Sequence, residues 1–163
     1  MNIPESFIAV AKCNTIKNIS LGYDEIYIFE VDNIEKGQIG YSIDEEGNKL
    51  TTEDERGWNS NWLVIGYSEN TGDPFFIDTS SKDFPVFTSM HGEEIWDPTL
   101  IADTYLNFIE ILTRLHQLSL GREAPVEFES NPIPTEEIEE IISEIEVKNR
   151  ESEVWYWENF LEQ

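Results

Sequence analysis

The chain has 163 residues, of which 34 are acidic and 10 are basic, so its formal net charge is −24 at pH 7. This charge repels phosphate backbones and anionic lipids, so nucleic acids and membranes are not expected as partners. It attracts basic proteins, although the acidity could also serve only solubility. Hydrophobic residues make up 39% of the chain, which is enough for a folded core. We predict a cytoplasmic protein, because the sequence has a single cysteine, no signal peptide and no apolar run of about 18 residues.

The first part of the chain is predicted to form a helix followed by two strands. Apolar residues at helical spacing after Pro4 predict a short helix over residues 3–11. β-Branched and aromatic residues predict a strand over residues 25–31, and alternation of apolar with small residues predicts another over residues 38–43. The polar span of residues 44–60 is predicted to be a loop.

Three further strands are predicted to follow in close succession. They span residues 62–67, 74–78 and 85–88. The short turns between them indicate an antiparallel meander. Gly72 and Asp73 are predicted to form one of these turns, because glycine adopts a positive φ and aspartate bonds its own backbone. Asp78 is predicted to cap another turn, and the alternative for both aspartates is that they face a partner.

The second half of the chain is predicted to be helical. Apolar residues on one face predict a helix over residues 98–118 that packs across the sheet, with Asp97 or Thr99 as its N-cap. A linker with several prolines follows. Regularly spaced isoleucines then predict a helix that starts at Thr135 and includes Ile145.

The last segment, residues 151–161, carries an apolar stripe that must cover either the main domain or a second subunit. We expect Trp155 and Phe160 to pack on the sheet or its helix, and a dimer contact is the alternative. The chain is thus expected to be a monomer or a weak homodimer.

Together these elements predict an α+β fold, in which helices pack on a twisted antiparallel sheet of about five to six strands. Residues 1–120 are predicted to form this domain. Residues 121–163, with 13 acidic and 3 basic residues, are predicted to form an acidic helical C-terminal extension that packs on the same domain.

Three segments resemble, in their order and spacing, the motifs of a known group of proteins. The first is Ile3-Pro4-Glu5-Ser6-Phe7-Ile8, the second is Trp62-Leu63-Val64-Ile65-Gly66 with Gly72-Asp73 and Phe76-Ile77-Asp78, and the third is Pro85-Val86-Phe87 with Tyr105-Leu106-Asn107-Phe108-Ile109. They are similar to the opening helix, the core hairpin, and the last strand and closing helix of the SUKH superfamily, which includes cell-wall-assembly regulators and many bacterial toxin-immunity proteins. The family's Asn-Gly-Gly after the opening helix is replaced here by Cys13-Asn14-Thr15.

The resemblance implies an α+β domain that binds a partner protein, without catalysis and without a cofactor. In bacteria such domains act as immunity proteins that neutralise a cognate toxin, and many of those toxins are nucleases with basic clefts. We therefore expect an acidic surface to occlude a basic toxin, helped by electrostatic steering and a few aromatic anchors. The alternatives are a regulatory scaffold for cell-wall or signalling proteins and an enzyme of unknown type.

Acidic loop and turn residues, with one tryptophan as an exposed aromatic anchor, are the predicted partner-binding residues. They are Asp44, Glu45, Glu46, Glu53, Asp54, Glu55, Trp58, Asp73 and Asp78. Four oxygen ligands of this loop also match positions one, three, five and twelve of a calcium loop; they are Asp44, Glu46, Asn48 and Glu55. Lys49 replaces the glycine that such a loop needs, so a solvated acidic loop open to a basic partner is preferred to a metal site.

Motifs for catalysis are missing from the sequence. It has no Gly-x-Ser-x-Gly, no phosphate loop and no glycine-rich dinucleotide turn. Cys13 is expected to be a small core residue. His116 is expected near the C-terminal end of a helix, where the helix dipole favours a positive charge. Ser89 and His91 offer a hydroxyl and an imidazole two residues apart, but alternation along a strand explains this spacing without catalysis. No catalytic residue, metal or cofactor is therefore assigned.

Overall fold

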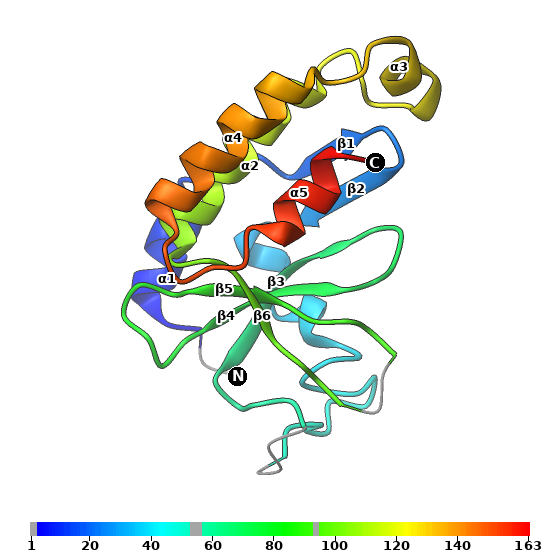
Figure 1. The fold of residues 1–163 in the computed structure, drawn as a ribbon. Coiled ribbons are helices and arrows are strands. Elements are labelled where there is room, and N and C mark those ends of the chain that lie inside the picture. The colour runs from blue at the N-terminus through cyan, green and yellow to red at the C-terminus, as the bar shows by residue number, and fades with distance from the viewer. Residues whose placement is uncertain (1–2, 53–56, 93–94) are drawn as a thin grey trace.

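The computed structural model describes residues 3–52, 57–92 and 95–163 and has an α+β fold (Figure 1). Six strands form one antiparallel sheet, and each strand pairs with the next one in the chain. The strands are β1 (Asn18–Leu21), β2 (Asp24–Ile28), β3 (Trp62–Ser68), β4 (Pro74–Asp78), β5 (Val86–Thr88) and β6 (Thr99–Ala102). The helices are α1 (Glu5–Ala11), α2 (Tyr105–Ser119), α3 (Pro125–Ser130), α4 (Thr135–Lys148) and α5 (Trp155–Leu161), with short 3-10 turns η1 (Val31–Asn33) and η2 (Lys36–Gln38). The predicted fold class and the meander are confirmed.

Strand β1 and helix α3 form where the sequence predicted no strand or helix, and two predicted segments differ from the structure. Residues 38–43 do not form a strand; Gln38 ends the η2 turn, and an irregular loop follows it. The long helix starts at Tyr105 and not near residue 98, because residues 99–102 pair with β5 as strand β6. Its N-cap is Thr104, whose hydroxyl oxygen accepts a hydrogen bond from the main-chain N–H of Asn107.

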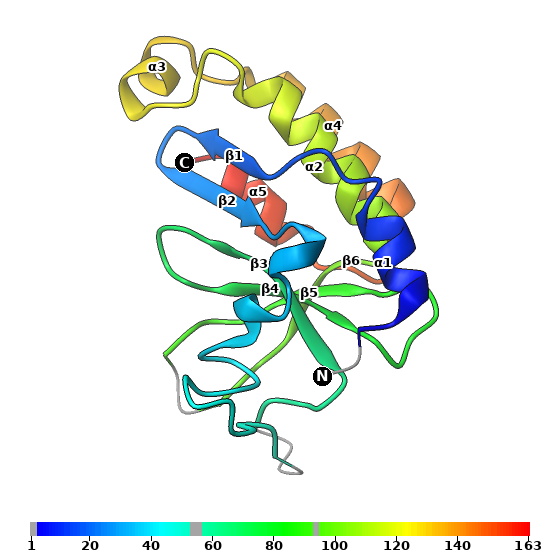
Figure 2. The same cartoon turned by 180° about the vertical axis from the view of Figure 1, so that it is seen from behind.

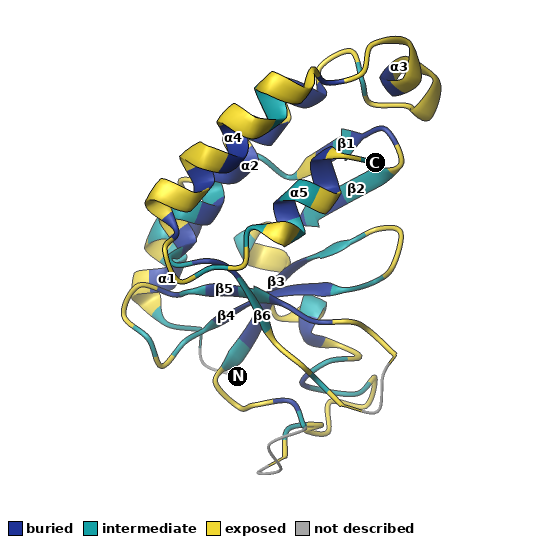
Figure 3. Cartoon of the chain, in the orientation of Figure 1, coloured by how far each residue is buried: buried dark blue, intermediate teal, exposed yellow. Residues whose placement is uncertain are grey.

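The sheet curls around helix α2, which contacts both of its edge strands, β1 and β6. Helices α1 and α5 also pack on this concave side, so the main core lies between the sheet and these three helices. Helix α4 lies alongside α2 in both views of the molecule (Figures 1 and 2). Its buried residues are Ile141, Ile142 and Ile145, and most of its other residues are exposed (Figure 3). None of the helices in the described ranges has the length and apolar character that a bilayer crossing requires.

The C-terminal segment covers the edge of strand β6. The N–H of Glu153 donates to the carbonyl of Leu100, and the indole Nε1–H of Trp157 donates to the carbonyl of Ile101 at 2.8 Å. Trp157 and Phe160 are buried in the main core, as expected for Phe160. The same expectation is wrong for Trp155, whose side chain lies outside the core and is 47% exposed.

The convex side of the sheet has a second, smaller core instead of a helical layer. Trp58, Val64 and Phe76 are its buried members. Described residues of the irregular segment between β2 and β3 fold back over this face, and Figure 1 shows most of them below the sheet in cyan. The two faces are therefore covered differently: helices seal one, and a loop covers part of the other.

Replacing Trp157 with alanine should destabilise the protein by about 3–5 kcal/mol, because the change leaves a large cavity and an unpaired carbonyl on β6. Replacing Trp155, two residues earlier, with alanine should cost about 1 kcal/mol or less, because its side chain is half exposed. Urea unfolding monitored by circular dichroism measures both changes. Equal losses for the two variants would contradict the docking of α5 described above.

Candidate functional site: an aromatic groove on the convex face of the sheet

Three aromatic side chains form a patch on the convex face of strands β2 and β3. Alternation along β2 buries Ile26 and Ile28 on the concave side and turns Tyr27 outward, with Phe29 following on the same side. Tyr67 of β3 lies directly opposite Tyr27 in the antiparallel register. The ring centroids of Tyr27, Phe29 and Tyr67 are 5.4 to 5.8 Å apart, so the three rings contact one another.

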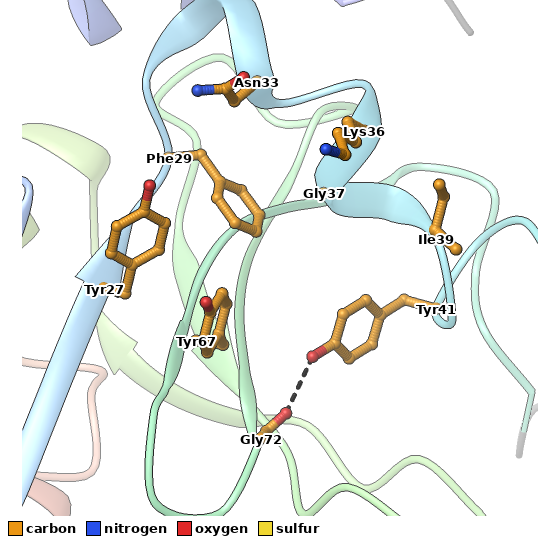
Figure 4. Close-up of a pocket in the computed structure, with 9 residues that line it drawn as sticks. All are labelled: Tyr27, Phe29, Asn33, Lys36, Gly37, Ile39, Tyr41, Tyr67 and Gly72. Atoms are coloured by element: carbon orange, nitrogen blue, oxygen red, sulfur yellow. Dashed lines mark hydrogen bonds between the residues drawn. The ribbon is translucent and has the colours of Figure 1, made fainter.

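The segment that follows β2 supplies the opposite wall of a groove over this patch (Figure 4). The cavity between them is open to solvent and has a volume of about 510 Å³. Its wall residues come from η1, η2 and the loop after them: Asn33, Lys36, Gly37, Ile39 and Tyr41. The hydroxyl of Tyr41 donates to the carbonyl of Gly72 at 2.9 Å, which ties this wall to the β3–β4 turn (Figure 4).

The buried side chain of Gln38 fixes the position of this wall. Its Nε2 donates to the carbonyls of Val64 and Ile34, both at 2.8 Å, and its Oε1 accepts from the N–H of Val64 at 3.0 Å. The amide thus pairs with the main chain of β3 as a neighbouring strand would, at the place where β2 has ended. Gly37 is required beside it, because a Cβ atom there would come within 2.2 Å of the Phe29 ring.

Carboxylates surround the groove and influence its phenols. The pKa of Tyr67 is raised by partial burial and by the neighbouring Glu69 and Glu25. The pKa of Tyr41 is raised to about 12, mainly by burial and also by Tyr67 and Asp73. Both phenols therefore stay neutral at physiological pH and act as hydrogen-bonding groups. Lys36 is the cation among the residues that line the cavity.

Trp58, predicted to be an exposed aromatic anchor, is instead 1% exposed. Its ring packs on Trp62 and Phe76, with centroids 5.4 and 5.0 Å away, and its indole N–H donates to the carbonyl of Trp62. The prediction is wrong because a polar loop was expected to leave the tryptophan in solvent. The loop turns back and buries the ring against the convex face of the sheet.

The acidic loop residues lie in three different situations. The carboxylate of Asp44 accepts hydrogen bonds from the main chain and side chain of Asn48, which lower its pKa, so it shapes its own turn. Glu45 and Glu46 are exposed to solvent. The remaining predicted residues of this loop, Glu53, Asp54 and Glu55, lie outside the described residues. In the described ranges no group of three His, Cys, Asp or Glu side chains is placed to hold a metal ion.

The two predicted aspartates of the hairpin lie at opposite ends of β4. Gly72 has the expected positive φ of 74°, which confirms the turn. The carboxylate of Asp73, however, accepts from the N–H of His91 at 2.6 Å and not from its own turn. Asp78 accepts from the N–H and hydroxyl of Ser80, as expected of a turn cap.

The residues considered for catalysis are dispersed. Cys13 is exposed in the turn after α1, so the expectation that it belongs to the core is wrong. His116 lies exposed in the last turn of α2, as predicted. His91 is exposed in the loop after β5, next to Tyr41, and not on a strand as expected. The three side chains thus come from three separate parts of the molecule.

The aromatic groove was not predicted from the sequence. The available signal was alternation in Ile26-Tyr27-Ile28-Phe29, because isoleucines that face the core require the intervening aromatic residues to face away from it. Such an arrangement is suited to recognition by apolar contact and hydrogen bonding. No protein-family model, curated protein or solved structure matches the chain, so the groove is interpreted from its own residues.

Replacing Gln38 with methionine should destabilise the protein by about 2–4 kcal/mol, because it leaves the N–H and carbonyl of Val64 buried without partners. Gln117→Met, at an exposed position of α2, is the matched control and should change stability by about 0.5 kcal/mol or less. Chemical denaturation of both variants measures the difference. Equal stability of Gln38→Met and the control would contradict this role of the Gln38 amide.

The raised pKa of Tyr41 predicts a loss of stability at high pH. A folded-state pKa of about 12, against an ordinary value of 10.0, means that the folded state holds this proton more tightly. The contribution of Tyr41 to the free energy of unfolding is therefore complete below about pH 10 and is lost as the pH rises towards 12. Subtracting the tyrosinate absorbance titration of Tyr41→Phe from that of the wild type isolates this group. A difference curve with its midpoint near 10 would show that the phenol is not buried in the groove.

Proposed function

We propose that this chain is a non-enzymatic protein-binding domain that neutralises a basic toxin, in the manner of the SUKH-type immunity proteins it resembles. One observation carries the proposal: an open groove floored by Tyr27, Phe29 and Tyr67 lies on the sheet face that the described helices leave uncovered. Clustered aromatic side chains at a partly exposed site are typical of the residues that dominate protein interfaces.

The charge of the chain supports a basic partner. Within the described ranges the ion pairs are Arg114–Glu144 and Lys148–Glu110, both between α2 and α4. Most carboxylates of a chain with 34 acidic residues therefore have no cation of the same chain to neutralise them. Their summed field attracts a positively charged protein and speeds its encounter with the groove.

The chemistry of the groove supports binding more than catalysis. Among the described residues that line it, the titratable groups are three tyrosines and Lys36. The raised pKa of Tyr41 and of Tyr67 keeps these phenols protonated, which makes them poor general bases or nucleophiles at neutral pH. Neutral phenols instead offer hydrogen-bonding groups to a partner, and the hydroxyl of Tyr41, which already donates to Gly72, offers its oxygen as an acceptor.

The test is a binding measurement with the purified protein encoded by the adjacent gene. We expect a complex whose affinity falls steeply between about 50 and 200 mM salt, and inhibition of the partner's activity at equimolar ratio. Tyr67→Ala should weaken the complex by about tenfold or more, because it removes the centre of the aromatic patch. Val147→Ala, at an exposed apolar position of α4, is the control and should bind as the wild type does.

Two results would contradict the proposal. One is the absence of any complex at low salt with the products of both neighbouring genes. The other is a complex that Tyr67→Ala leaves unchanged. A complex that is lost with Tyr67→Ala but is insensitive to salt would indicate a regulatory scaffold, because its affinity would rest on apolar burial and not on charge.

A further inference from the structure

A second groove lies on the other side of the β3–β4 turn, between this turn and the start of α5. It consists of two adjoining cavities of about 190 and 500 Å³, which share Asp73, Trp155 and Tyr156 as lining residues. Gly72 lines the aromatic groove on the convex face, and the next residue, Asp73, lines this second groove. The β3–β4 turn therefore separates the two grooves.

The second groove gathers large apolar side chains that a protein normally buries. Trp155 is 47% exposed, and Met90 and Ile95 beside it are also exposed. Met90 and Ile95 lie between β5 and β6, and Trp155 is the first residue of α5. An exposed apolar cluster of this kind indicates a surface that is covered by something else.

The polar groups of the groove show which kind of occupant would suit it. Carboxylates stand along it at Asp24, Asp73 and Asp97, and none of the described residues that line either cavity is basic. The hydroxyl of Thr88, a residue of the larger cavity's wall that is 6% exposed, has no hydrogen-bond partner among the described residues. The groove thus offers acceptors for several N–H donors beside an apolar surface.

We propose that this groove binds an arginine side chain of a partner protein, with its guanidinium at Asp73 and Asp97 and its plane on the indole of Trp155. An apolar residue next to that arginine would cover Met90 and Ile95. Arginine suits the site better than lysine, because a guanidinium has five donors and stacks on aromatic rings. The inference rests on the proposed function in taking the basic partner as the source of this arginine.

A second copy of the chain is a weaker candidate for the same groove. Two molecules with a net charge of −24 each repel one another. The groove itself adds three carboxylates to any contact between them. Charge complementarity therefore favours a cationic segment over self-association.

The direct test uses the blocked peptide acetyl-Leu-Arg-Leu-amide and two matched peptides in which citrulline or lysine replaces the arginine. Indole N–H signals in NMR spectra report binding, and Trp155→Phe identifies the signal of Trp155. We expect the arginine peptide to shift the Trp155 signal, the lysine peptide to shift it at about tenfold higher concentration, and the citrulline peptide to have no effect. No shift with the arginine peptide, or equal shifts with all three peptides, would overturn the inference.

Charge-matched variants separate the groove from the general acidity of the surface. Asp73→Asn with Asp97→Asn should reduce the response to the arginine peptide by about tenfold or more. Asp83→Asn with Glu139→Gln removes the same charge from exposed positions outside the groove and should leave the response unchanged. Equal losses in the two double variants would overturn the inference, because they would show an unspecific effect of net charge.

The same variants keep this inference distinguishable from the proposed function. A partner complex that is lost with Tyr67→Ala, but unaffected by the Asp73→Asn and Asp97→Asn pair, would overturn the arginine site and leave the proposed function intact. Peptide binding without any partner complex would support the arginine site and contradict the proposed function. Concentration-dependent dimers that disappear in Trp155→Glu would show that a second copy occupies the groove, which also overturns the inference.

Discussion

The arrangement of the convex face depends on one buried amide. Gln38 makes two hydrogen bonds to the main chain of Val64 and one to Ile34, and so takes the place of a strand beside β3. Without it, the segment after β2 would have no regular pairing with the sheet, since β2 ends at Ile28. With it, the wall that carries Lys36 and Tyr41 stands at a fixed position over Tyr27, Phe29 and Tyr67. A single polar side chain thus turns an open sheet face into a groove.

Unequal covering of the two sheet faces links the fold to the proposed function. The concave face is sealed by α1, α2 and α5, and the α5 segment also bonds to the edge of β6 through Trp157. Stability can therefore come largely from this side, while the convex face keeps partly exposed aromatic side chains. In the proposed complex, the excess of carboxylates would supply long-range attraction, and the aromatic residues would supply short-range contact. The β3–β4 turn at Gly72 and Asp73 touches both grooves, so one bound partner would be able to contact both of them.

Local patterns in the sequence were sufficient for the elements with strong periodicity and failed where distant contacts decide. Strands β3 and β4 follow from apolar runs that flank a turn, and helices α2 and α4 follow from helical spacing, apart from the start of α2. Strands β1 and β6 have four residues each and are defined by their pairing, which a local pattern does not reveal. The failure at residues 38–43 has the same origin, because Gln38 is buried by a strand 26 positions away. Trp58 was misplaced for this reason too, whereas Gly72, whose φ is a local requirement, was predicted correctly.

Amide hydrogen exchange of the complex with a basic partner is the most direct test of binding at the aromatic groove. We expect slower exchange on binding in residues 31–41 and around Gly72 and Asp73, with little change along the outer face of α4. That pattern would place the partner over the convex face and its bordering turn. Slower exchange confined to α2 and α4, with the aromatic groove still open to solvent, would show that the partner binds elsewhere.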